Sequence, residues 1–285
     1  MKKITLNEFP KYSLWVGRLL NYVPWEKPSR NTEKVELEYN QDKYKKCLDY
    51  FYSQVNDVTM ESIKRFEFEL DPNEEICISL KDELYKIPLQ EGRNRYYQLL
   101  VKYIENNFGN CASIVELGCG YGYNLTLLQE HLSQSCQFWG GEYSENAVKL
   151  GNLLNKDESI GLTKFDFYDE NTYGFLEQVK APILLFTSHA IEQLPSCEKF
   201  IKNLYPYKHK IQGVMHFEPT FERYDTATLM GLLRYCYIEA NDYNKDLISQ
   251  LSGRPEIQML MIEENILGLN PLNPTSVIHW QFIGS

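Results

Sequence analysis

The chain has 285 residues, 43% of them hydrophobic, which is enough for one large globular domain or a domain with an addition. Its formal net charge of −10 argues against a nucleic-acid partner, because such partners are bound by basic surfaces. No apolar run approaches the roughly 18 residues needed to cross a bilayer, and Met1–Trp15 lacks a signal-peptide core. We therefore expect a cytoplasmic protein with no membrane partner.

Cysteine and acidic residues show no spacing typical of a structural or metal site. The seven cysteines form no C-x-x-C pair, so neither a disulfide framework nor a zinc site is predicted. No other group of side chains has metal-ligand spacing. We expect reduced cysteines and no metal.

Residues 1–92 are rich in aromatic side chains and show no regular alternation of strands and helices. Helices are expected near Leu14–Leu20 and over Asp42–Val55. Extended segments are expected near Phe66–Leu70 and Ile76–Leu80. This region is interpreted as an amino-terminal cap, whose aromatic residues either form a small core of their own or cover a substrate.

One basic cluster lies inside this cap, and a second basic segment follows directly after it. Lys43, Lys45 and Lys46 are interpreted as a solvated helix face. An amphipathic helix is predicted over Arg93–Phe108. Two interpretations stay open for its polar side chains, a solvated arginine pair or contact with a ligand carboxylate: Arg93, Arg95 and Tyr96.

The most informative stretch is Ser113–Leu128, SIVELGCGYGYNLTLL, in which an apolar strand meets a glycine turn and then a helical pattern. Its glycines occupy alternate positions: Gly118, Gly120 and Gly122. Glycine there allows a sharp turn and close approach of a ligand. Tyr123 stands where the dinucleotide fingerprint requires a glycine, which disfavours NAD. Glu116 would repel a pyrophosphate but attract an ammonium group.

Two further acidic corners follow along the chain. Gln137–Glu142 reads as a strand, and Glu142 lies 22 residues after Gly120, at the spacing where a carboxylate accepts hydrogen bonds from a ribose diol. After another turn, Asp166 and Phe167 form the third corner. Three corners in this order favour a nucleoside ligand.

The motif E-x-G-x-G-x-G and the two acidic corners resemble the class I S-adenosylmethionine-dependent methyltransferases. The resemblance implies S-adenosylmethionine as cofactor and an α/β fold: a Rossmann-like, mostly parallel seven-stranded sheet with an antiparallel last strand. It implies a cap over residues 1–92 and a methyltransferase domain over residues 93–285. The implied cofactor-binding residues are Glu116, Gly118, Cys119, Gly120, Gly122, Glu142, Tyr143, Asp166, Phe167 and Ser188.

The remaining elements agree with that fold. A helix near Thr172–Val179 precedes two buried strands, Pro182–Phe186 and Gln212–Phe217. A helical region is expected over residues 225–251. Two closing strands are expected over Glu256–Ile266 and Ser276–Phe282, which the resemblance implies are an antiparallel pair.

Candidate catalytic residues follow the two buried strands, because ligands collect at the carboxyl ends of strands in an open α/β sheet. His189 and His216 are the candidates for a general base, since an unperturbed histidine titrates near neutral pH. His189 is favoured because the residue after the fourth strand is nearest the transferred methyl in the resembled family. Glu192 or Glu218 is expected to orient the imidazole.

A small-molecule O-methyltransferase is the favoured function, because the N-P-P-[FY] tetrapeptide of DNA and protein amide methyltransferases is replaced by T-S-H-A. The segments HFEP and NPLNPTSVIHW faintly resemble methyltransferases of bacterial surface-polysaccharide and capsular phosphoramidate clusters. The acceptor is therefore expected to be a small molecule or a carbohydrate-type compound. An N-methyltransferase of a small amine and a non-catalytic cofactor-binding subunit stay open, as does a homodimer.

Overall fold

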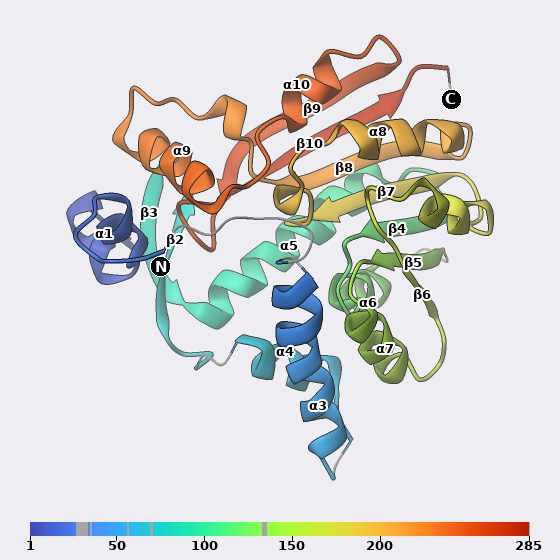
Figure 1. Cartoon of the computed structure of the whole chain (residues 1–285), viewed down its shortest axis with the longest axis horizontal. Coiled ribbons are helices and arrows are strands. Elements are labelled where there is room, and N and C mark those ends of the chain that lie inside the picture. The colour runs from blue at the N-terminus through green and yellow to red at the C-terminus, as the bar shows by residue number, and fades with distance from the viewer. Residues whose placement is uncertain (27–33, 35, 56, 69–70, 133–135, 285) are drawn as a thin grey trace.

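A seven-stranded sheet forms the centre of the molecule, with strand order β6-β5-β4-β7-β8-β10-β9 (Figure 1). The five strands from β6 to β8 pair in parallel, and β10 lies antiparallel between β8 and β9. The predicted Rossmann-like sheet with an antiparallel last strand is confirmed. The strands are β4 (Ser113–Leu117), β5 (Gln137–Glu142), β6 (Ile160–Lys164), β7 (Ile183–Ser188), β8 (Ile211–Glu218), β9 (Ile257–Leu267) and β10 (Thr275–Phe282).

The structure is a computed structural model and describes residues 1–26, 34, 36–55, 57–68, 71–132 and 136–284. Within these ranges, no helix has both the length and the apolar character that crossing a membrane requires. The α-helices are α1 (Trp15–Leu19), α3 (Lys45–Ser53), α4 (Met60–Phe68), α5 (Leu89–Phe108), α6 (Tyr123–His131), α7 (Glu145–Leu154), α8 (Glu198–Leu204), α9 (Leu229–Asn241) and α10 (Leu247–Ser252). The 3-10 and π-helical segments are η1 (Leu6–Lys11), η2 (Glu36–Tyr44), η3 (Glu170–Glu177), η4 (Ile191–Gln193), η5 (Tyr205–Tyr207) and η6 (Phe221–Arg223).

Helices cover both faces of the sheet because its central strands bury both faces. On β7, Leu184 and Phe186 pack in the same cluster as α5 and α6, whereas Ile183 and Leu185 pack with α8 and α10. Successive side chains of a strand point to opposite faces, so this continuous apolar run supplies two cores at once. The result is a three-layer arrangement whose strand ends are free to hold ligands.

The amino-terminal region divides into two parts that pack in different places. The first part consists of β1 (Lys2–Ile4), η1, α1 and the hairpin β2 (Glu75–Leu80) and β3 (Glu83–Pro88), and it packs largely with α9. Trp15 contacts Trp25 and Tyr237 edge to face within this part. The second part consists of η2, α3 and α4, and it packs on α7. We call this second part the cofactor-side cap.

Several predicted elements differ from the observed ones. The prediction of an extended segment over Phe66–Leu70 is wrong for residues 66–68, because these residues belong to the helix α4. The rest of that segment, which ends at Leu70, lies outside the described residues. Ile63 is fully buried and Phe66 stacks on Tyr50 at 4.1 Å between ring centroids, which is helical spacing toward one face. The Thr172–Val179 helix is the 3-10 helix η3.

The long helical region expected over residues 225–251 is two helices. Asp242 adopts a left-handed conformation with φ 53° and ends α9. The side chain of Asn244 then accepts the backbone N–H groups of Asp246 and Leu247, where α10 begins. A left-handed residue cannot continue an α-helix, so the chain changes direction here.

Arg234 of α9 fastens the small hairpin to the loop before β10. Its guanidinium is 1% exposed and donates to the carbonyls of Pro271 and Lys81 at 3.0 and 2.6 Å, and it pairs with Asp82 at 2.6 Å. We expect Arg234→Ala to lower the free energy of unfolding by about 2–4 kcal/mol, because buried carbonyls lose charged donors and a cavity remains. Urea denaturation measures this change.

Asp82→Ala is the matched control for the Arg234 variant. The Asp82 side chain is 69% exposed, so its loss is expected to cost no more than about 1 kcal/mol. Equal destabilisation by both variants would show that the exposed ion pair, and not the buried carbonyl contacts, carries the stabilisation.

Candidate functional site

The glycine loop joins β4 to α6 and touches the loop that follows β7. Gly118 and Gly120 have φ values of 78° and 56°, in the left-handed region that favours glycine. A Cβ on Gly118 would lie 2.3 Å from the Cβ of Ala190. The backbone N–H groups of Gly118 and Cys119 donate to the carbonyl of Gly141 at 2.7 and 3.2 Å, which fixes the loop against β5.

A cavity of about 660 Å³ opens at the carboxyl ends of these strands, a size that suits a small-molecule site. The predicted cofactor-binding and catalytic residues line it, except Gly122, His216 and Glu218. Of the three candidates on α5, Arg93 and Tyr96 line the cavity, whereas Arg95 pairs with Glu91 at 2.8 Å on the surface. The predicted residues in the wall are Glu116, Gly118, Cys119, Gly120, Glu142, Tyr143, Asp166, Phe167, Ser188, His189 and Glu192.

Gly122 lies outside the cavity wall and serves the helix instead. It is the N-terminal cap of α6, with φ 86°, and its nearest neighbour is the Leu162 side chain. The prediction that Gly122 lines the site is therefore corrected. Its position needs glycine for the turn into α6 and not for ligand approach.

The Glu142 carboxylate organises the loops at the end of β5. Its two oxygens accept the backbone N–H groups of Gly120 and Ser144, both at 2.8 Å. Burial raises the pKa of Glu142, and these two hydrogen bonds oppose the shift. The carboxylate thus stands in the wall of the cavity with its orientation fixed from both sides.

The Glu116 carboxylate at the end of β4 is only half satisfied. Its Oε1 accepts from the Asn124 amide at 2.7 Å, and among the described residues its buried Oε2 has no hydrogen-bond partner. Burial raises the pKa of Glu116 to about 8. A buried acceptor without a partner is costly, and a ligand cation would satisfy it.

The Asp166–Phe167 corner follows β6. Asp166 Oδ1 accepts the backbone N–H of Tyr168 at 2.8 Å, which closes the turn. Phe167 is buried against Phe165 and Phe200, with ring centroids 4.9 and 5.5 Å apart. The corner therefore brings Asp166 and Phe167 into the wall of the cavity.

His189 is the histidine that reaches the cavity. Its Nδ1 lies 2.9 Å from Glu192 Oε2, and its Nε2 lies 2.7 Å from Thr275 Oγ1. Its side chain is 29% exposed. Burial lowers its pKa, but the adjacent Glu192 carboxylate, with Glu218, outweighs that effect and leaves the pKa of His189 raised.

The backbone around His189 is strained and held from below. His189 has φ 50°, a conformation that is uncommon for a residue with a side chain and that clusters at functional sites. Buried Glu218 accepts the backbone N–H groups of Ala190 and Ile191 at 2.9 and 3.1 Å. Of the two carboxylates expected to orient the imidazole, Glu192 therefore contacts the ring, whereas Glu218 supports the backbone of the His189 loop.

His216 lies away from the cavity, which corrects the prediction that both histidines face it. Its side chain is fully buried, with Nδ1 2.9 Å from Thr187 Oγ1 and Nε2 accepting from Trp280 Nε1 at 2.9 Å. Burial lowers its pKa to about 3, so it stays neutral. The pleat of β8 turns this side chain toward α8, where it packs on Phe200.

The structure adds two groups of residues to the cavity that sequence reasoning missed. The first group comes from the start of β10: Asn273 precedes the strand and Thr275 is its first residue. The Asn273 amide donates to Glu192 Oε2 at 2.8 Å. The cofactor-side cap supplies the second group: Tyr39, Lys43, Tyr44, Lys64 and Glu67. Helical periodicity predicts which side of a cap helix is buried. It does not predict that this side meets the glycine loop and the strand ends, which are far away in sequence.

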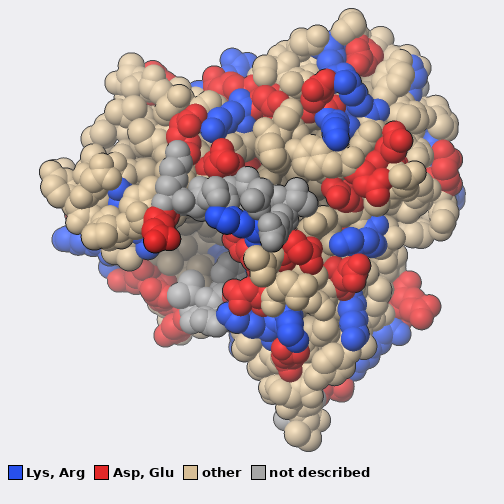
Figure 2. Space-filling view, in the orientation of Figure 1, with Lys and Arg blue, Asp and Glu red and all other residues tan. Residues whose placement is uncertain are grey.

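The lysine cluster of η2 and α3 divides between solvent and the cavity. Lys45 and Lys46 form exposed ion pairs with Asp49 and Asp42, as a solvated helix face predicts. Lys43 instead turns inward and pairs with Glu67 at 2.8 Å. On the face shown in Figure 2, acidic and basic side chains are interspersed over the coloured surface.

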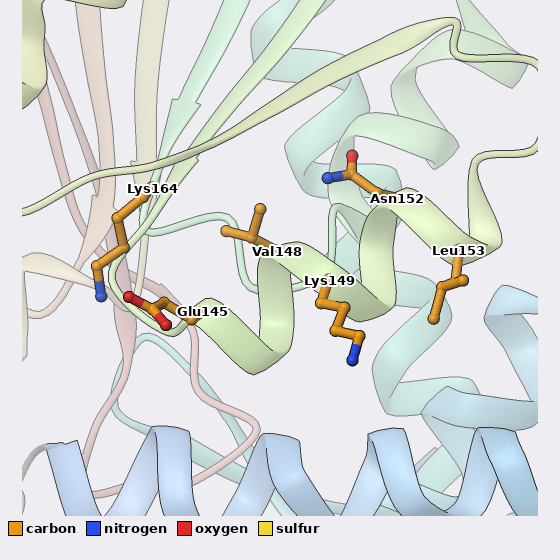
Figure 3. A pocket seen from close by; sticks show the side chains of 6 residues that line it. All are labelled: Glu145, Val148, Lys149, Asn152, Leu153 and Lys164. Carbon is orange, nitrogen blue, oxygen red and sulfur yellow. The ribbon is translucent and has the colours of Figure 1, made fainter.

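A second, shallower hollow of about 410 Å³ lies on the outer side of α7 (Figure 3). Its lining comes from α7 and from Lys164 at the end of β6. None of the predicted site residues belongs to it, so the cavity at the strand ends is the candidate site. Its lining residues are Glu145, Val148, Lys149, Asn152, Leu153 and Lys164.

Comparison with known proteins gives similarity at the level of solved structures. No protein-family model and no curated protein matches the chain. The plantazolicin methyltransferase BpumL in complex with SAH is 13% identical, with a TM-score of 0.46 over 85% of this chain and 98% of that one.

Two other solved structures are similar to the same extent. The N-methyltransferase NodS from Bradyrhizobium japonicum WM9, in complex with S-adenosyl-L-homocysteine, is 11% identical, with a TM-score of 0.46 over 85% and 100% of the two chains. The geranyl diphosphate C-methyltransferase from Streptomyces coelicolor A3(2) is 8% identical, with a TM-score of 0.47 over 67% and 80%. Similarity of this size does not establish a shared activity.

Proposed function

We propose that this protein is an S-adenosylmethionine-dependent methyltransferase that acts on a hydroxyl group of a small acceptor. The observation that carries the proposal is one cavity in which Glu116, Glu142 and Asp166 end or follow three neighbouring parallel strands around the glycine loop. These carboxylates match the separate hydrogen-bonding needs of an amino acid, a ribose and an adenine. His189 stands in the same cavity.

The chemistry of the wall residues suits that cofactor. The unsatisfied Oε2 of Glu116 fits the cofactor ammonium, and Glu142 fits the ribose hydroxyls, since a carboxylate accepts two hydrogen bonds. Asp166 and Phe167 would hold the adenine through the Asp166 carboxylate and the Phe167 backbone. When bound, S-adenosylmethionine supplies an electrophilic methyl group.

His189 is the general base in this proposal. Glu192 fixes the imidazole through Nδ1, so Nε2 is the nitrogen that takes a proton, once the acceptor hydroxyl replaces Thr275 Oγ1 as its hydrogen-bond partner. His216 takes no part because its side chain is fully buried and does not line the cavity.

The acceptor side of the cavity combines these polar groups with apolar ones. Asn273 and Thr275 line the same cavity as Ile76, Leu89 and Leu269. This mixture suits a small molecule with a hydroxyl beside an apolar part. An acceptor of the surface-polysaccharide type stays a prediction from the faint sequence resemblance.

The proposed function is tested by binding and turnover of the full chain. Calorimetric titration is expected to show binding of S-adenosylhomocysteine. A panel of hydroxyl compounds, nucleotide sugars and small amines then tests conversion of S-adenosylmethionine. Turnover with amines alone would favour N-methylation, binding without any turnover would favour a non-catalytic subunit, and absence of binding would overturn the proposal.

Glu142→Ala is expected to weaken S-adenosylhomocysteine binding by roughly 10- to 100-fold, because the ribose loses a charged acceptor and the Gly120 and Ser144 N–H groups lose theirs. Calorimetric titration measures the change. Glu145→Ala is the control: this acidic residue lies three positions on, in the outer hollow. Unchanged affinity in Glu142→Ala would remove Glu142 from the site.

A further inference from the structure

The side-chain amide of Asn273, in the wall of the cavity, uses only one of its two ends. Its Nδ2 donates to Glu192 Oε2 at 2.8 Å. A carboxylate accepts hydrogen bonds, so the amide must turn its nitrogen toward Glu192 and its oxygen to the other side. That Oδ1 is buried and has no hydrogen-bond partner among the described residues. A buried acceptor in this state costs free energy until a donor is brought to it.

The loop between β9 and β10 holds this amide in place. Pro274 follows Asn273 directly and restricts it to an extended conformation. The backbone N–H of Asn273 donates to the Asn270 carbonyl at 2.9 Å. Arg234 Nε fastens the same loop through the Pro271 carbonyl at 3.0 Å. The position of the amide is therefore set before an acceptor binds.

Asn273 and Thr275 contact the two members of one hydrogen-bonded pair. Side chains two positions apart on an extended chain lie on the same face. Asn273 Nδ2 and His189 Nδ1 both contact Glu192 Oε2, at 2.8 and 2.9 Å. Thr275 Oγ1 lies 2.7 Å from the other nitrogen of His189. The unpartnered Oδ1 of Asn273 therefore belongs to the same small group of side chains as the proposed base.

This group offers an acceptor two hydrogen-bonding positions. The hydroxyl that is methylated passes its proton to His189 Nε2, while its oxygen bonds to the methyl carbon and the carbon–sulfur bond of the donor breaks. A second group must donate to Asn273 Oδ1, because an amide oxygen only accepts. A second hydroxyl supplies that hydrogen bond without bringing a charge into the wall.

We propose, resting on the proposed function, that Asn273 selects acceptors that carry a second hydroxyl group close to the one that is methylated. The acceptor class is then a polyhydroxylated compound and not a simple alcohol. The reaction stops after one methyl group, because the ether that forms has lost the O–H that Asn273 Oδ1 requires.

The test compares two probes with the full chain and S-adenosylmethionine. One is a cyclohexanediol with hydroxyls on adjacent carbons, and the other is cyclohexanol, which lacks the second hydroxyl. The wild type is expected to favour the diol by roughly 10- to 100-fold in kcat/KM and to form only its monomethyl ether by mass spectrometry. Asn273→Ala should reduce this ratio to about twofold, the statistical advantage of two hydroxyls.

Asn270→Ala is the matched control. Asn270 belongs to the same loop and lines the same cavity, but its Oδ1 already accepts the backbone N–H of Leu272 at 3.1 Å. This variant should keep the preference for the diol. Loss of the Glu192 contact in Asn273→Ala disturbs His189 equally for both probes, so the ratio reports on Oδ1 alone. If circular dichroism shows that Asn273→Ala is unfolded, Asn273→Ser takes its place.

Several outcomes overturn the inference and leave the proposed function intact. These are a ratio of about twofold in the wild type, an unchanged ratio in Asn273→Ala, and an equal loss of the ratio in Asn270→Ala. Methylation of other hydroxyl compounds but not of the diol, or ready formation of its dimethyl ether, also overturns it. Turnover of no hydroxyl compound at all overturns the proposed function itself.

Discussion

Replacing His189 by alanine is expected to lower turnover by roughly 10²- to 10⁴-fold, the usual contribution of a general base, with little change in affinity for S-adenosylhomocysteine. The physical reason is that Nε2 is the titratable nitrogen that faces the cavity, held by Glu192 on one side and beside Thr275 on the other. The measurement is kcat at saturating donor, alongside calorimetric titration.

The pH dependence of kcat tests whether His189 is the general base. The pKa of His189 is raised above 6.5, so the fraction of neutral imidazole, and with it kcat, is expected to fall as the pH drops through that raised value. Saturating donor is needed because burial raises the pKa of Glu116 to about 8, and its titration affects donor binding. His189→Ala should lack this acidic limb.

Glu192→Gln provides the matched control for the limb. It keeps a hydrogen-bonding side chain next to Nδ1 but removes the charge that raises the pKa of His189, so the limb should move to lower pH. Near-normal turnover of His189→Ala with an intact limb would contradict the assignment. It would favour an amine acceptor or catalysis by positioning, since His216 is sealed in the core.

Gly118→Ala is the second change with a large expected effect. Its Cβ would lie 2.3 Å from the Ala190 Cβ, and φ is 78°, so the substitution combines a collision with backbone strain. We expect a loss of about 2–4 kcal/mol in the free energy of unfolding. We also expect about 100-fold weaker binding of S-adenosylhomocysteine, because the loop and the His189 segment must move apart.

Gly122→Ala separates the effect of backbone strain from the effect of the collision with Ala190. Gly122 has φ 86°, but its nearest neighbour, Leu162, is at an ordinary 3.5 Å. This variant should show strain of about 1–2 kcal/mol by urea denaturation and near wild-type affinity. If both alanine variants lose affinity equally, the backbone conformation of the loop matters more than its contact with Ala190.

The sequence by itself determined the features that depend on short stretches. The apolar run and glycines of Ser113–Leu128 predict a strand, a turn and a helix, and the structure has them at β4, the loop and α6. Glu142 and Asp166 end or follow strands, and parallel strands end at one edge, so their place in one cavity was predictable. His189 was found by the same reasoning.

Tertiary structure decided which side chains turn toward that edge and which turn away. The strand β8 is buried on both faces, so it carries no alternation that would show His216 pointing into the core. The helix α4 depends on Phe66 stacking on Tyr50, and Lys64 and Glu67 reach the cavity only because this cap packs on α7. Thr275 meets His189 across 86 positions of sequence. Contacts of this kind are fixed by packing between distant segments, and local residue patterns do not encode them.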